Sequence, residues 1–83
     1  MDELAKLYQQ LNNLLFYLQR NTKLNIYSSF DITEILVSVC NNNGDIIYTH
    51  HVEGIDIKQD SIIIFELKQV INYLINLKNE IKT

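Results

Sequence analysis

The sequence predicts an α+β fold in which an N-terminal helix and a C-terminal helix flank an antiparallel β-hairpin or three-stranded sheet. Two observations lead to this fold class. Apolar residues recur at steps of three and four at both ends of the chain, and between these ends they alternate with polar residues. The 83 residues include only 2 glycines and no proline, which favours long regular elements joined by short loops. We expect residues 1–83 to form a single domain.

The first helix is predicted over residues 2–20. Its apolar positions follow the helical period and form one stripe, which consists of Leu4, Leu7, Tyr8, Leu11, Leu14, Leu15 and Leu18. Phe16 and Tyr17 lie beside this stripe and are expected to widen it. Acidic residues near the start and Arg20 near the end suit the helix dipole.

The middle of the chain predicts a β-hairpin with strands over 32–40 and 45–52. Both runs are rich in β-branched residues, and the segment NNNG lies between them. Asn-Gly is a strong hairpin signal because both residues tolerate positive φ. Additional strands over 24–28 and 55–57 stay open as alternatives.

The strand pairing follows if Asn43 and Gly44 are the two central turn residues. The pairs on the more apolar face, which is expected to lie against the helices, are Val39–Tyr48, Val37–His50 and Ile35–Val52. The residues of the other face are Leu36, Ser38, Cys40, Ile47, Thr49 and His51, with Cys40 opposite Ile47. His50 and His51 therefore point to opposite faces.

The second helix is predicted over residues 61–81. Its apolar stripe consists of Leu67, Val70, Ile71, Leu74, Leu77 and Ile81. Asp60 or Ser61 can cap the start of the helix. The segment IIIF at 62–65 is ambiguous, because its β-branched residues also suit a strand.

The hairpin holds the only cysteine and both histidines of the chain. Cys40 and His51 lie about 13 Å apart at roughly 3.3 Å per residue, whereas zinc needs ligand atoms within about 2.3 Å. The sequence contains no glycine-rich phosphate loop and no nucleophile motif. We therefore expect no metal site, no cofactor and no enzymatic activity.

The single cysteine excludes an internal disulfide. No stretch of 18 consecutive apolar residues is present, and the start of the chain lacks a signal-peptide pattern. These features predict a cytoplasmic protein. The frequent asparagine, isoleucine and lysine are common in proteins of AT-rich genomes and indicate a bacterial host cell.

The charge is unevenly distributed along the chain, which has a net charge of −3. Residues 31–67 carry Lys58 as their only lysine or arginine, against the acids Asp31, Glu34, Asp45, Glu53, Asp56, Asp60 and Glu66. Such a surface repels phosphate, so direct binding to nucleic acid is not expected. It suits docking on a basic protein surface. The alternative is that these acids only keep a small protein soluble and protect edge strands.

The order of elements and the segment TEILVSVCNNNGDIIYTHHVEG resemble small phage-encoded anti-CRISPR proteins, in particular inhibitors of type II Cas9 effectors. In that family, acidic side chains on strands and loops mimic DNA. The resemblance implies a non-catalytic inhibitor or modulator, encoded by a phage or mobile element, that binds a larger basic protein. Its candidate binding residues are Asp31, Glu34, Asp45, Glu53, Asp56 and Asp60.

A homodimeric structural or regulatory module is the alternative function. Two helices cannot easily cover both faces of a small sheet, so apolar side chains are expected to stay exposed and to mark an interface. The candidate interface residues are Leu36, Cys40, Ile47, Tyr73 and Ile75.

Overall fold

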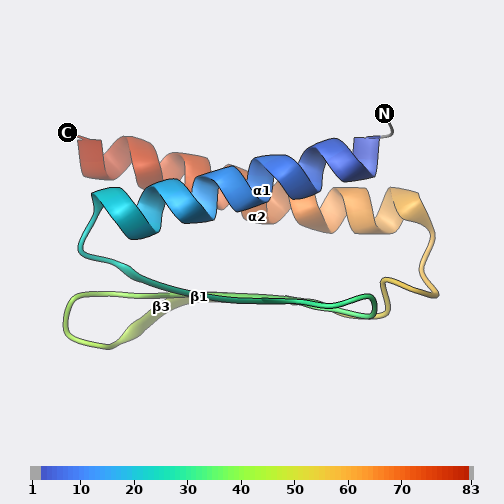
Figure 1. Cartoon of the computed structure of the whole chain (residues 1–83), viewed down its shortest axis with the longest axis horizontal. Helices are drawn as coiled ribbons and strands as arrows, with labels where there is room; N and C mark the ends of the chain where they lie inside the picture. The colour runs from blue at the N-terminus through green and yellow to red at the C-terminus, as the bar shows by residue number, and fades with distance from the viewer. Residues whose placement is uncertain (1–2, 83) are drawn as a thin grey trace.

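The computed structural model of the chain describes residues 3–82 and confirms the predicted α+β fold class. The elements are the helix α1, the strands β1, β2 and β3, and the helix α2, with the bounds Glu3–Asn21, Asn25–Phe30, Ile35–Cys40, Ile46–Val52 and Asp60–Lys82. Figure 1 shows two layers, with both helices on the same side of the sheet. The two helices run in the same direction, because three antiparallel strands return the chain to the end at which α1 begins.

The sheet has the strand order β1-β2-β3, and each strand is antiparallel to its neighbour. The possible strand at 24–28 is present as β1. The possible strand at 55–57 is absent, because this segment forms a turn. The N–H groups of Ile57 and Lys58 both donate to the carbonyl of Gly54, at 3.0 and 2.8 Å, so the backbone bends back instead of extending along the sheet.

The hairpin between β2 and β3 has the predicted pairing but a different turn. Val39 pairs with Tyr48, yet the loop contains three residues, since Asn41 N–H donates to the Asp45 carbonyl at 2.9 Å. Within this loop only Gly44 adopts a positive φ, +90°. This loop shifts the pairing by one residue, and a bulge restores it. Cys40 consequently pairs with Ile46 and not with Ile47.

The core lies between the helices and the sheet. Its side chains come from both helical stripes and from the inner face of the sheet: Leu7, Leu11, Leu14, Leu15, Leu18, Ile35, Val37, Val39, Val52, Ile63, Leu67, Val70, Ile71 and Leu74. Phe16 does not widen the buried stripe of α1, as it is 64% exposed. A step of one residue rotates a helical position by about 100°, so Phe16 lies at the rim of the stripe, in an open groove, while Leu15 is buried.

The ambiguous segment 62–65 is helical and belongs to the first turns of α2. Only Ile63 of this segment is fully buried, whereas Ile62 and Phe65 are exposed. The spacing from Ile63 to Leu67 and Leu74 is that of one helical face. The helical period of the core positions therefore prevails over the β-branched composition.

None of the helices within the described residues is both long enough and apolar enough to cross a membrane.

Candidate functional site

One end of the molecule collects most of the predicted acidic residues. The turn between β1 and β2, the chain after β3 and the start of α2 all lie at this end (Figure 1). A hydrogen bond of 2.9 Å from Ile55 N–H to the Thr33 carbonyl joins the first two of these segments. We call this region the acidic end, and its carboxylates are those of Asp31, Glu34, Glu53, Asp56 and Asp60.

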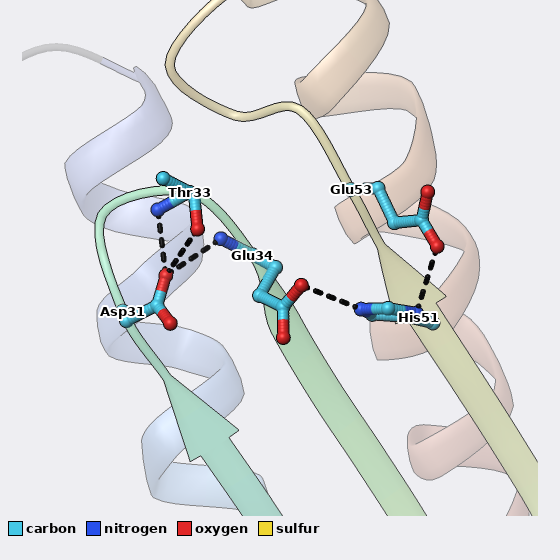
Figure 2. A network of polar contacts seen from close by, with 5 residues as sticks. All are labelled: Asp31, Thr33, Glu34, His51 and Glu53. Carbon is cyan, nitrogen blue, oxygen red and sulfur yellow. Dashed lines mark hydrogen bonds and ion pairs between the residues drawn. The ribbon is translucent and has the colours of Figure 1, made fainter.

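Asp31 holds the turn between β1 and β2. Its Oδ1 atom accepts hydrogen bonds from Thr33 N–H at 2.7 Å, Thr33 Oγ1 at 2.7 Å and Glu34 N–H at 3.0 Å (Figure 2). The Thr33 hydroxyl, followed by the two backbone donors, lowers the pKa of the Asp31 carboxyl below its usual value. The carboxylate is exposed, and its bonds fix the position of Glu34 immediately before β2.

His51 lies between two carboxylates on the face of the sheet that the helices leave open. Its Nε2 is 3.2 Å from Glu34 Oε2, and its Nδ1 is 3.0 Å from Glu53 Oε1 (Figure 2). A neutral imidazole has one N–H, whereas an ionised carboxylate can only accept. Both contacts are therefore hydrogen bonds only when the imidazole carries a proton on each nitrogen.

The same geometry separates the potential metal ligands. The two carboxylates approach opposite nitrogens of the His51 ring, so they do not converge on one ion with it. Within residues 3–82, no group of three or more histidine, cysteine, aspartate or glutamate side chains is placed to hold a metal ion.

The lysines near the acidic end contact other carboxylates. Lys58 Nζ is 3.4 Å from Glu66 Oε2, and Lys68 Nζ is 3.0 Å from Glu3 Oε2. In the part of the chain that the structure describes, no lysine or arginine forms an ion pair with the five carboxylates of the acidic end. Among the described residues, only His51, when it is protonated, brings a positive charge into contact with any of them.

Asp45 does not belong to the acidic end. It lies at the tip of the β2–β3 hairpin, at the opposite end of the sheet. Its backbone N–H donates to Asn41 Oδ1 at 2.9 Å, and its Oδ2 accepts from Asn41 Nδ2 at 3.4 Å. The six predicted acidic residues are thus divided, with five at one end and Asp45 at the other.

The predicted interface residues lie in several different places. Leu36 and Ile47 are exposed on the open face of the sheet. Tyr73 of α2 stacks on Tyr48 of β3, with ring centroids 3.8 Å apart, and Ile75 lines a groove between the helices. Cys40 is 8% exposed, so the prediction that it is an exposed outer-face residue is wrong. The bulge sets both Ile46 and Ile47 opposite Cys40.

His50 points to the inner face, as the pairing predicted. Its ring stacks on Tyr48 at 6.4 Å between centroids, and its Nε2 atom is buried without a hydrogen-bond partner. Burial also raises the pKa of Tyr48, and the neighbouring Tyr73 adds to this shift. The two adjacent histidines therefore occupy opposite environments.

The sequence reasoning missed the role of His51 beside Glu34 and Glu53. A signal was present, because Leu36 pairs with His51 and residues two apart on a strand share a face. The expected pairing therefore already placed Glu34 and Glu53 on the face of His51.

The described cavities are open grooves. One of about 590 Å³ lies between the two helices, and its lining contains lysines, amides, Tyr17 and apolar side chains but no carboxylate. Lys78 Nζ lies 4.3 Å from the centroid of the Tyr17 ring there. This groove holds no pair of acid and base groups.

No protein-family model, no curated protein and no solved structure matches the chain. The resemblance to anti-CRISPR proteins therefore stays a prediction.

Proposed function

We propose that this protein is a non-catalytic binding protein that docks its acidic end, with the adjoining open face of the sheet, on a basic surface of a larger protein. The observation that supports this proposal is the gathering of five carboxylates at one end without an ion pair to lysine or arginine among the described residues. Like charges collected at one end attract a basic partner and repel phosphate.

The opposite end of the long axis carries basic residues, so the molecule has an electric dipole along this axis. Arg20 lies in the last turn of α1, and Lys23 follows that helix. The molecule measures 37 Å along this axis, which is several times the Debye length of about 8 Å at physiological ionic strength. A basic partner therefore meets the acidic end first, with little opposition from the basic end.

The open face of the sheet supplies the apolar part of the proposed interface. Tyr27, Leu36 and Ile47 are exposed on it, and the hydroxyls of Ser38 and Thr49 satisfy one another at 3.0 Å. Protein interfaces commonly combine such an apolar centre with a charged rim. Glu34 and Glu53 lie on the same face at its acidic end.

A groove that binds nucleic acid is the kind of basic surface that this arrangement fits. The resemblance to small anti-CRISPR proteins suggests a specific instance, a type II Cas9 effector inhibited by a chain from a phage or mobile element. The alternative explanation is that the carboxylates serve the fold, since Asp31 holds a turn and Asp60 begins a helix at its positive end.

The test therefore uses carboxylates that neither hold a turn nor begin a helix. Glu53→Lys combined with Asp56→Lys reverses two charges of the acidic end, and Asp45→Lys is the matched control at the hairpin tip. DNA cleavage by purified Cas9 with its guide RNA is measured with each protein, together with DNA binding by the same complex. We expect inhibition by the wild type and by Asp45→Lys, and at least about tenfold weaker inhibition by the double variant.

Equal inhibition by all three proteins would reject the acidic end as the docking surface. No inhibition by the wild type would reject the Cas9 effector as the partner. In that case, the wild type and both variants are immobilised and the proteins they retain from a bacterial lysate are compared. Retention of basic proteins that is lost in the double variant alone would keep the acidic end as a docking surface for a different partner.

A further inference from the structure

The free edge of β1 is the feature that the proposed function leaves unused. The N–H of Asp31 donates to the Glu34 carbonyl at 3.0 Å, so odd-numbered residues of β1 form the hydrogen-bonded pairs with β2. The backbone groups of Ile26, Ser28 and Phe30 therefore point outward. Ile26 N–H agrees with this, because it donates to the side-chain Oε1 of Gln19 at 2.8 Å.

This edge lacks the features that protect edge strands. The strand sequence NIYSSF has no charge and no proline, and its pairing with β2 contains no bulge. Five of its six residues are exposed. Within residues 3–82, no hydrogen-bond partner meets the outward backbone groups of Ser28 and Phe30. The edge of β3, by contrast, carries the bulge near Ile47 and the charged group around His51.

The flank of α1 continues the surface of this edge. A groove of about 260 Å³ lies between them and is lined by uncharged residues, namely Asn12, Leu15, Phe16, Gln19, Ile26 and Ser28. The exposed ring of Phe16 lies on this flank, with the Arg20 guanidinium 5.5 Å from its centroid. An occupant of the edge would also cover this apolar ring.

We propose that a second copy of this chain pairs with the β1 edge, antiparallel and about a two-fold axis at Tyr27, so that two sheets join into one of six strands. The outward residues must face one another, which places Ile26 opposite Ser28 of the second copy. Tyr27, 62% exposed on the open face, then faces the same residue of the second copy. Exposed aromatic side chains opposed in this way stabilise strand pairs.

The charges at the two ends of β1 favour a second copy as the occupant. Lys23 precedes the strand and Asp31 follows it. In the antiparallel arrangement centred on Tyr27, each Lys23 lies opposite Asp31 of the other copy, so two pairs of opposite charge form. A parallel arrangement would place like charges together. The edge is therefore complementary to itself in this one orientation.

Gln19 competes with the second copy. Its side chain occupies the Ile26 N–H, which the pairing would give to the Ser28 carbonyl of the other copy. Removal of the Gln19 amide therefore favours association, whereas removal of the outward Ser28 N–H opposes it. These two opposite directions separate the proposal from a general loss of stability.

The first experiment is sedimentation equilibrium of the full chain over a range of concentrations. We expect a mass approaching twice the 9.8 kDa of one chain. Ser28→Pro removes an outward N–H without touching the bonds to β2, and should raise the dimer dissociation constant at least about tenfold. Thr49→Pro is the control, because Thr49 holds the equivalent outward position on the edge of β3. It should leave the dimer intact.

Gln19→Ala should lower the same dissociation constant. Lys23→Glu should raise it at low ionic strength, and added salt should reduce this increase because it screens the repulsion. A wild type that stays monomeric at every concentration would overturn the proposal. So would dimerisation that Ser28→Pro and Lys23→Glu leave unchanged. Circular dichroism of each variant tests whether the fold is retained. If Ser28→Pro unfolds, the dissociation constant of Lys23→Glu decides between the outcomes.

The register is tested by cross-linking in a Cys40→Ala background, which removes the native thiol. Tyr27→Cys brings two cysteines opposite each other at about 4.5 Å between Cα atoms, a distance that suits a disulfide. Ser29→Cys separates them by roughly 13 Å along the strands. Mild oxidation should link the first variant and not the second, and equal linking would reject this register. Cross-linking is measured on the purified protein alone, so its outcome does not depend on whether the acidic end docks on a partner.

Discussion

The two faces of β2 differ more than any other pair of neighbouring surfaces in this molecule. Ile35 and Leu36 are adjacent, yet Ile35 is 1% exposed against the helices and Leu36 is 38% exposed on the open face. Both helices cover the same side of the sheet. Alternate side chains of a strand are therefore either buried in the core or exposed on the open face. Residues of the inner face hold the two layers together, and those of the open face are free to meet a partner.

The largest expected effect compares these two neighbours directly. Ile35→Ala and Leu36→Ala delete side chains with the same number of carbon atoms. Ile35→Ala should lower the free energy of unfolding by about 2–5 kcal/mol, because it leaves a cavity in the core. Leu36→Ala should lower it by less than about 1 kcal/mol. Urea denaturation followed by circular dichroism measures both, and equal losses would contradict the division between the faces.

The adjacent histidines provide a second comparison, with a smaller effect of opposite sign. His50 Nε2 is buried without a partner, whereas both nitrogens of His51 contact carboxylates. His50→Phe keeps a ring beside Tyr48 and removes the unpartnered nitrogen, so it should raise the free energy of unfolding by about 1 kcal/mol. His51→Phe should lower it by less than about 1 kcal/mol, since exposed ion pairs contribute little.

Thermal or urea unfolding at neutral pH measures these two variants. Destabilisation by His50→Phe that exceeds the loss in His51→Phe would show that the inner face has no space for the larger ring. The environments of the two residues would then differ by shape and not by the cost of an unsatisfied polar atom.

The inner face could be predicted from the sequence because it depends on periods. Val37 pairs with His50 as expected, and the stripe through Leu11 and Leu18 is buried as expected. The fixed side-chain periods of strands and helices carry that information. The predicted two-residue turn at Gly44 is wrong, but the predicted strand pairing is still correct. The extra loop residue and the bulge opposite Cys40 compensate each other in the pairing.

The acidic end could be predicted only in part. A hairpin places its tip far from its base, so the separation of Asp45 from Glu34 and Glu53 follows from the predicted strands alone. The joining of the segments around Asp31 and Asp56 does not follow from any period. It depends on the positive φ of Gly54, +67°, and on the bond from Ile55 N–H to Thr33. The alternation of isoleucine and aspartate at 55–57 suits a strand and gives no sign of that turn.

The smallest expected effect concerns Asp31, which both holds a turn of the fold and belongs to the acidic end. Its hydrogen bonds from Thr33 and Glu34 lower its pKa in the folded chain. A carboxyl with a depressed pKa stabilises the fold above its unfolded value of about 3.9, and this contribution is lost as the pH falls through the lower folded pKa. Asp31→Asn keeps an oxygen acceptor for the turn but does not titrate. Its free energy of unfolding should therefore fall less steeply than that of the wild type below about pH 4.

Urea denaturation at a series of pH values between about 2 and 6 compares the two profiles. Asp31→Ala is the matched control, because it removes the turn bonds at every pH and should lower the whole profile. Parallel profiles for the wild type and Asp31→Asn would mean that the carboxylate charge adds nothing to the turn. Asp31 would then hold the turn as a hydrogen-bond acceptor alone.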